Sequence, residues 1–268
     1  MFALIEAAKR EKGTFAERLR RSVSGYRGVI AYSERILSLP LFHVVIEQAP
    51  PESRRAQKRI DEAVNILLRR NITRLCFRED FLFREKFLNA GFCELDDGFL
   101  RRLMAGEIAA KAAEGENKTA VLYSRRFSSL ESKALFDLCL NFRYVIAESE
   151  RGGRDVFRRA EREFGIAPIE KLTEPGLKSA DVAVLFAAPG RKLIFPQKCV
   201  VLALEPEVLN MVECAGYISK VEFSFPREVI GRIPDGYPRE AIVSEATSFG
   251  LVKTDRIKVK NVETWRKP

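Results

Sequence analysis

Histidine is almost absent from this chain: its 268 residues include one, His43, within the apolar run Leu41-Phe-His-Val-Val-Ile-Glu. A Ser-His-Asp triad cannot be assembled without it, and a histidine inside a buried strand is expected to be a hydrogen-bonded core or edge side chain rather than a general base or metal ligand. No cluster of histidine, cysteine and carboxylate has metal-ligand spacing. We therefore expect no metal and identify no catalytic residue.

Paired cysteines are also missing. The five cysteines stand alone at wide spacings in apolar segments, in odd number and without a Cys-x-x-Cys motif: Cys76, Cys93, Cys139, Cys199 and Cys214. This pattern is typical of reduced, buried thiols and argues against a disulfide framework or a zinc site.

Long hydrophobic runs do not occur. The longest, such as Asp181-Val-Ala-Val-Leu-Phe-Ala-Ala, are far shorter than the roughly 20 residues that a membrane span requires. The chain starts with apolar residues followed by charged ones, which is the reverse of a secretory signal. We expect a cytoplasmic protein that has no membrane segment.

Positive charge, in contrast, is abundant. The formal net charge is +9, and arginine forms six Arg-Arg doublets, at 20–21, 54–55, 69–70, 101–102, 125–126 and 158–159. Such a balance favours contact with an anionic partner. A solvated helix face explains most of the doublets equally well, because most fall within or at the ends of expected helices.

The first part of the chain has the pattern of helices followed by a small α/β unit. Helical spacing predicts helices over the first forty residues, interrupted by glycine and ending at Pro40. Strands are expected at 41–47 and 72–77, with an amphipathic helix between them. The polar stretch Glu114-Gly-Glu-Asn-Lys-Thr predicts a boundary, which gives domains of residues 1–116 and 117–268.

The second part alternates strands with helices. Strands are expected to start at Thr119, Arg143, Ala180 and Cys199, the last two as unbroken apolar runs, and the capping-box pattern Ser128-x-x-Glu131 starts a helix after the first strand. Such runs are expected for strands that are covered on both faces. The sequence therefore predicts an α/β fold whose second half is a mostly parallel, Rossmann-like sheet flanked by helices.

From Thr119 to Glu205 this alternation of strands and helices resembles the half-sheet of nicotinamide-cofactor dehydrogenases. The resemblance implies that Glu148, at the end of the second strand, occupies the position of the acid that binds the adenosine ribose. The first turn, however, reads Tyr123-Ser-Arg-Arg-Phe-Ser-Ser and lacks the Gly-x-Gly-x-x-Gly that admits a pyrophosphate. We therefore do not expect conventional NAD(P) to be the cofactor, and the sequence identifies no other.

The turns after these parallel strands should meet at one edge of the sheet, where open α/β folds bind ligands. Three turns combine cations with serine or glycine: Ser124-Arg-Arg-Phe-Ser-Ser, Ser149-Glu-Arg-Gly-Gly-Arg and Pro189-Gly-Arg-Lys. The first two lead directly into helix N-termini, which favour anions. The sequence predicts a site for a small anionic ligand or nucleotide, formed by Arg125, Arg126, Ser128, Glu148, Arg151, Gly152, Gly153, Arg154 and Arg191.

Three functions are compatible with this sequence. The first is a non-catalytic protein that binds the anionic ligand at the carboxyl edge of the second sheet. The second is a nucleic-acid-associated protein that uses arginine doublets and a basic C-terminal strand, although no RNA-binding signature or recognition helix is present. The third is a divergent nucleotide-dependent enzyme.

Overall fold

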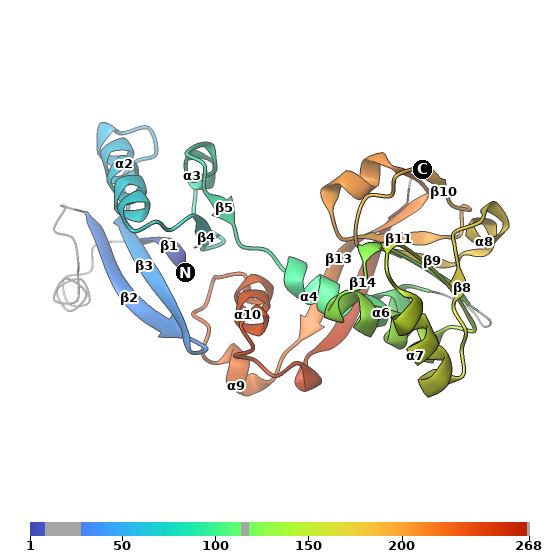
Figure 1. Cartoon of the computed structure of the whole chain (residues 1–268). Helices are drawn as coiled ribbons and strands as arrows, with labels where there is room; N and C mark the ends of the chain where they lie inside the picture. Colours follow the sequence, from blue (N-terminus) through green and yellow to red (C-terminus); the bar gives the residue numbers. More distant parts are fainter. Residues whose placement is uncertain (9–27, 114–117, 267–268) are drawn as a thin grey trace. The chain divides into compact units, whose positions relative to one another are not determined.

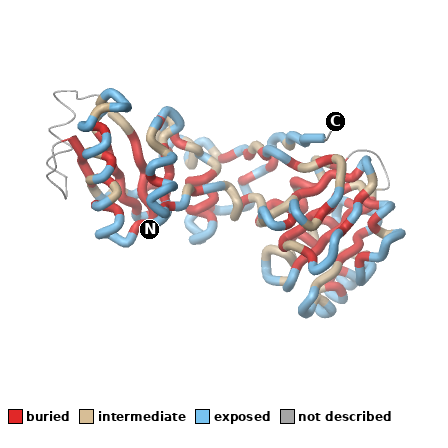
Figure 2. Tube along the Cα trace, turned by 90° about the horizontal axis from the view of Figure 1, so that it is seen from above, coloured by how far each residue is buried: buried red, intermediate tan, exposed pale blue. Residues whose placement is uncertain are grey.

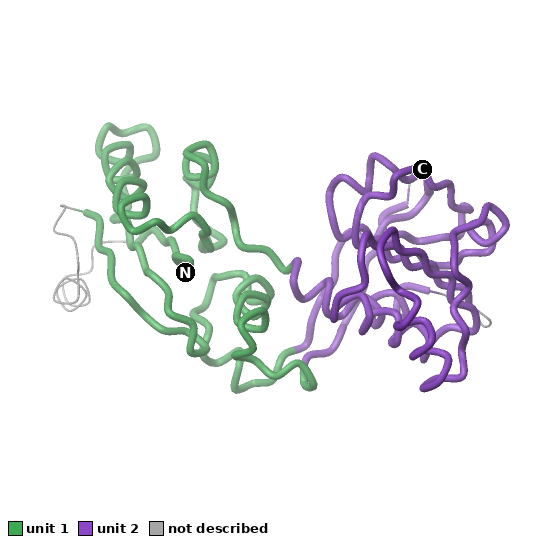
Figure 3. The backbone as a smooth tube through the Cα atoms, in the orientation of Figure 1, with its two compact units in different colours: residues 1–97, 225–256 green, residues 98–224, 257–268 purple. Residues whose placement is uncertain are grey.

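The computed structural model describes residues 1–8, 28–113 and 118–266. The chain forms two compact units (Figure 3). Unit 1 contains residues 1–97 and 225–256, and unit 2 contains residues 98–224 and 257–268. Each unit has its own sheet, and we describe each by itself.

The sheet of unit 1 has five strands in the order β2-β3-β1-β4-β5 (Figure 1). All neighbouring pairs are parallel except β2 and β3, which form an antiparallel hairpin. The strands are β1 (Phe2–Ala8), β2 (Val29–Ile36), β3 (Leu39–Glu47), β4 (Arg74–Phe77) and β5 (Cys93–Glu94).

Helix α2 (Arg54–Arg69) supplies the main apolar cover of this sheet. Its Ser53 cap accepts a hydrogen bond from the Ala56 N–H, and its buried face includes Ile60 and Leu67. These residues share a core with inward-facing strand residues and with a group of phenylalanines around α3 (Arg84–Asn89): Phe77, Phe81, Phe87 and Phe92.

Residues 225–256 return to unit 1 after the chain has formed most of unit 2. They form α9 (Arg227–Ile230), α10 (Arg239–Ser248) and the short 3-10 turn η2 (Thr254–Arg256). Arg74 of β4 forms an ion pair of 2.7 Å with the buried Glu245 of α10. The returning segment is therefore an integral part of unit 1.

The helices predicted for the first forty residues are wrong where the structure describes them: residues 2–8 and 29–36 are strands, and residues 9–27 lie outside the described part. Phe2 to Ile5 are buried because β1 is a central strand, and a short apolar run of this kind fits a helix and a buried strand equally well. The β2–β3 turn is formed by Leu37 and Ser38, whose φ values of 51° and 68° are unusual for these residue types. No glycine or asparagine marked this hairpin.

The sheet of unit 2 has seven strands in the order β14-β13-β11-β9-β6-β7-β8. Every neighbouring pair is parallel except β13 and β14. The strands are β6 (Thr119–Arg126), β7 (Tyr144–Arg151), β8 (Ile169–Glu170), β9 (Val182–Leu185), β11 (Val200–Ala203), β13 (Gly216–Ser224) and β14 (Lys258–Arg266). The six parallel strands follow the 3-2-1-4-5-6 order of dinucleotide-binding folds, which confirms the predicted Rossmann-like sheet.

Helices cover both faces of this sheet (Figure 1). On one face, Leu177 of α8 (Glu174–Ser179) shares a core with Val121 and Ile146. On the other face, α6 (Ser129–Asn141) packs between α5 (Ala105–Ala112) and α7 (Arg154–Phe164). The strands at the centre of the sheet are accordingly mostly buried (Figure 2), and β6 is exposed only at Arg125 and Arg126. The remaining elements are α4 (Gly98–Leu103), η1 (Pro206–Asn210) and the strand pair β10 (Leu193–Ile194) and β12 (Val212–Glu213).

The two units divide the chain differently from the predicted boundary at residues 116 and 117. The change of unit falls at 97–98, because α5 packs against α6, β9 and β14 and so belongs to unit 2. A second difference is that 225–256 belongs to unit 1. The sequence holds no signal for such a return, since it depends on contacts between residues far apart in the chain.

All five cysteines are free thiols. Cys76, Cys139 and Cys199 are buried as predicted, whereas Cys93 is exposed and Cys214 is partly buried. Within the described residues, no helix has the length and apolar composition needed to cross a membrane.

We predict that Phe87→Ala lowers the free energy of unfolding by about 3–5 kcal/mol, because it opens a cavity in the phenylalanine group of unit 1. Leu88→Ala is the matched control, since the neighbouring side chain on α3 is 37% exposed. It should cost much less. Equal losses in urea unfolding of the two variants would contradict this description of the core.

Candidate functional site

Strands β6 and β7 continue together beyond the end of β9. The last residue of β9, Leu185, pairs with Tyr123, whereas β6 runs on to Arg126 and remains paired with β7 as far as Arg151. Arg126 and Arg151 are direct partners in this parallel register. Their side chains therefore leave the same face of the sheet, at its carboxyl edge.

Two further predicted cations each lie within three residues of this pair in the chain. Arg125 precedes Arg126 on β6, and Arg154 is the first residue of α7, three positions after Arg151. All four arginines are exposed. Among the residues that the structure describes, none of the four forms an ion pair.

The Gly152–Gly153 pair connects β7 to α7 through left-handed backbone, with φ of 76° and 113°. A Cβ on Gly153 would lie 3.2 Å from Phe157 and 3.4 Å from Phe127, whose rings pack edge to face. Gly153 is thus required by conformation and packing, whereas the position beside Gly152 is open. As the N-cap of α7, Gly153 supplies no side-chain hydrogen bond to the first turn.

The N-terminus of α6 is closed by its own capping box. The Ser128 hydroxyl accepts the Leu130 N–H at 3.4 Å, and the Glu131 carboxylate accepts the Ser128 N–H at 2.9 Å. In a dinucleotide-binding fold this helix N-terminus holds the pyrophosphate. Here a carboxylate of the chain itself lies there. Ser128 therefore has a structural role as the cap of this helix.

Glu148 and Arg191 come together, but as partners of each other. The Arg191 guanidinium lies 3.0 Å from a Glu148 carboxylate oxygen and donates a second bond of 2.6 Å to the Leu172 carbonyl. The same Glu148 oxygen accepts the Leu172 N–H at 2.7 Å. These contacts connect the loop after β8, which contains Leu172, and the loop after β9, which contains Arg191, to Glu148 on β7.

A pocket of about 510 Å³ lies beside Arg191, with an apolar lining that includes Leu177 and Phe195. Its three cations all have carboxylate partners: Lys178 with Glu174 at 2.7 Å, Arg191 with Glu148 at 3.0 Å, and Lys192 with Glu213 at 2.9 Å. The pocket therefore offers less uncompensated positive charge than the ends of β6 and β7.

Tyr123 and Glu150 form a polar contact at this edge that the sequence did not indicate. The Tyr123 hydroxyl donates to Glu150 at 2.6 Å and accepts the N–H of Gly190. Burial, followed by the Glu150 carboxylate, raises the pKa of Tyr123 to about 12. The phenol is therefore a neutral structural link between strands at neutral pH.

The residues predicted for the site thus separate into two groups. Arg125, Arg126, Arg151, Gly152 and Arg154 lie at the projecting end of β6 and β7 or in the turn that follows it. Ser128, Glu148, Gly153 and Arg191 make structural contacts within unit 2. No group of three or more histidine, cysteine and acidic side chains in the described ranges could hold a metal ion.

Comparison with known proteins gives a fold likeness only. No family model matches the chain, and no curated protein matches it. Among solved structures it is similar to a probable ornithine cyclodeaminase from Bordetella pertussis, with 14% identity, a TM-score of 0.32, and 38% of this chain and 35% of that chain covered. It is also similar to the iminosuccinate reductase of Paracoccus denitrificans in complex with NAD+, with 13% identity, a TM-score of 0.33, and 60% and 51% covered.

A dipicolinate synthase structure from Bacillus halodurans is a third similar one, with 9% identity, a TM-score of 0.32, and 67% of this chain and 66% of that chain covered. The match thus spans between about a third and two thirds of these three proteins. At such scores the likeness adds no argument about ligand or activity. The fold assignment rests on the strand order of unit 2.

We predict that Ser128→Ala destabilises the protein by about 1 kcal/mol, because it removes the N-cap of α6. The control is Ser129→Ala, which changes the exposed residue next to the cap and should be close to neutral. Thermal unfolding of both variants measures the difference. A Ser128 variant as stable as the Ser129 variant would show that the capping box does not hold this turn.

Proposed function

We propose that unit 2 binds a small phosphate-bearing ligand, such as a mononucleotide, at the projecting end of β6 and β7. Arg126, Arg151 and Arg154 hold the anion, and the exposed Gly152 lets it approach the backbone. Arg125 adds positive charge from the other face of β6. This is a binding role rather than a catalytic one, because guanidinium groups remain protonated at neutral pH and do not act as acids or bases.

The observation that carries the proposal is the uncompensated charge of this edge. Arg126 and Arg151 are register partners on strands about 4.8 Å apart, and Arg125 and Arg154 are close by in the chain. Like charges at this spacing repel, and an anion bound among them offsets the repulsion. Arginine also matches the geometry of phosphate oxygens, which it binds in a bidentate manner.

The N-terminus of the neighbouring helix α7 supports the same position for the anion. The first turn of α7 carries the acidic Asp155, but no side chain caps it, so its N–H groups and the helix dipole remain available to attract an anion. The N-terminus of α6 offers no such site, because Glu131 lies there. We therefore propose that the phosphate lies after the second strand of the fold and not after the first, where a dinucleotide pyrophosphate lies.

We predict that adenosine monophosphate binds the protein in isothermal titration calorimetry, and that Arg126→Ala with Arg151→Ala weakens this binding by about a hundredfold or more. The reason is the loss of two charge-assisted hydrogen bonds, each contributing about 1.5–3 kcal/mol. Arg159→Ala is the matched control. It removes the same charge from α7, where Arg159 pairs with Glu163 at 2.8 Å.

Binding that is equally weak in the control variant, or absent from the parent protein, would contradict the proposal. The salt dependence of the binding affinity distinguishes the proposed ligand from nucleic acid. Binding of one phosphate group should weaken by about tenfold or less between about 50 and 200 mM salt, whereas a protein with 6–10 backbone phosphate contacts loses about 10³–10⁵.

A further inference from the structure

Unit 1 contains a pocket of about 330 Å³ between the β2–β3 hairpin and the returning segment 225–256. Leu37 and Ser38, at the tip of the hairpin, line one side of it, and residues between Pro226 and Arg256 line the other. Cavities of about 300–1,000 Å³ are typical of small-molecule sites, so this pocket suits a compact ligand. No residue of the proposed phosphate site lines it.

Much of the lining of this pocket is apolar. Leu37 and Val252 are buried, and Val229 and Leu251 add apolar surface that is still accessible. A ligand that covers these side chains removes apolar surface from water, which favours binding. The pocket therefore favours a ligand whose larger part is apolar.

The leucine at the tip of the hairpin is an unusual choice. Two-residue turns with positive φ at both positions normally contain Asn-Gly, whereas here Leu37 and Ser38 have φ of 51° and 68°. Such backbone is strained for a leucine and persists only where its surroundings hold it in place. The Leu37 side chain is nevertheless buried, so the strained turn supplies one apolar wall of the pocket.

The charge of the lining is positive. Three cations and one carboxylate line the pocket, and Arg256 lies 3.0 Å from that carboxylate, Glu228. Arg232 and Lys253 are exposed and form no ion pair with any residue that the structure describes, and we call them the free cations. The Ser38 hydroxyl also has no hydrogen-bond partner in the described ranges. The pocket thus combines an apolar wall with donors that are available to an anion.

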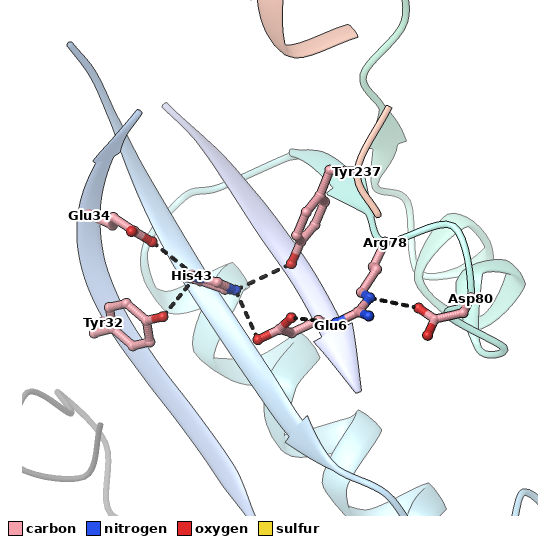
Figure 4. Close-up of polar contacts among 7 residues, drawn as sticks. All are labelled: Glu6, Tyr32, Glu34, His43, Arg78, Asp80 and Tyr237. Carbon is pink, nitrogen blue, oxygen red and sulfur yellow. Dashed lines mark hydrogen bonds and ion pairs between the residues drawn. The ribbon is translucent and has the colours of Figure 1, made fainter. Parts of the chain in front are cut away.

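The two sides of the pocket are linked to each other through His43 (Figure 4). His43 lies on β3 and is 5% exposed, which agrees with its interpretation as a hydrogen-bonded core residue. Its Nδ1 lies 2.8 Å from the Tyr32 hydroxyl and 3.0 Å from a Glu34 carboxylate oxygen, both on β2 of the hairpin. Its Nε2 lies 3.4 Å from a Glu6 oxygen on β1 and 3.2 Å from the Tyr237 hydroxyl of the returning segment. These contacts hold the pocket in shape before a ligand binds, which lowers the entropic cost of binding.

We propose that this pocket is a second ligand site, which binds a small carboxylate with an apolar body. The apolar body packs against Leu37 and Val229, and the two carboxylate oxygens provide an acceptor for each of the free cations. Guanidinium and ammonium groups form charge-assisted hydrogen bonds with carboxylates, which are stronger than neutral ones. The site does not depend on the phosphate site of unit 2, because the two share no residue.

We predict that millimolar phenylacetate shifts the methyl NMR signals of Leu37, Val229, Leu251 and Val252 in the full chain. Two related probes separate the contributions of charge and apolar surface. Acetate has the carboxylate without the ring and should bind at least about tenfold more weakly. 2-Phenylethylamine has the ring with a positive charge and should leave these signals unchanged. Methyl signals that ignore phenylacetate, or that respond equally to the amine, would overturn the proposal.

Substitution of the free cations tests their role. Arg232→Ala with Lys253→Ala should raise the Kd for phenylacetate by about tenfold or more, because both charge-assisted contacts are lost. Lys58→Ala is the control, since Lys58 is exposed on α2 and does not line the pocket. It should leave the Kd unchanged. Equal affinities of the double variant and the control variant would also overturn the proposal.

Titration with adenosine monophosphate keeps the two proposed sites apart. The double variant Arg232→Ala with Lys253→Ala should bind adenosine monophosphate as the parent protein does, because the arginines of unit 2 are intact. A loss of affinity for adenosine monophosphate as large as the loss for phenylacetate would indicate a general effect of net charge and would contradict a separate pocket.

Discussion

The parallel register of β6 and β7 is the constraint on which the functional account depends. It extends these two strands past β9 and places Arg126 directly beside Arg151. The backbones of these two residues stay side by side, because the rest of each strand lies in a buried sheet. The fold thus places two exposed positive charges side by side at one edge of the sheet, which is the basis of the proposed anion site.

At the place where other folds of this strand order bind a dinucleotide, several side chains make contacts within the protein. Ser128 and Glu131 satisfy the first turn of α6 with the chain's own oxygens, and Glu148 is engaged by Arg191 and the Leu172 N–H. Strand order and ligand site are therefore separable properties: the six-strand order is retained, while the side chains that would receive a pyrophosphate and a ribose make contacts within the protein.

The sequence predicted the elements whose signal is local. Short apolar segments marked the strands β6, β7, β9 and β11, and Ser128-x-x-Glu131 marked the start of α6. It did not predict β1 and β2, because a central strand lacks alternation and the Leu37–Ser38 turn lacks the usual residues. Nor could it predict which arginines have partners. The contacts of Arg191 with Glu148 and of Tyr237 with His43 join residues 43 and 194 positions apart.

The most direct test of the central claim is a crystal structure of the protein with adenosine monophosphate. The account predicts phosphate density at the projecting end of β6 and β7, within hydrogen-bond distance of Arg126 and Arg151 and close to the first turn of α7. Phosphate density at the first turn of α6, with Glu131 displaced from it, would contradict the account. So would a fully occupied nucleotide elsewhere on unit 2 that leaves these arginines without an anion.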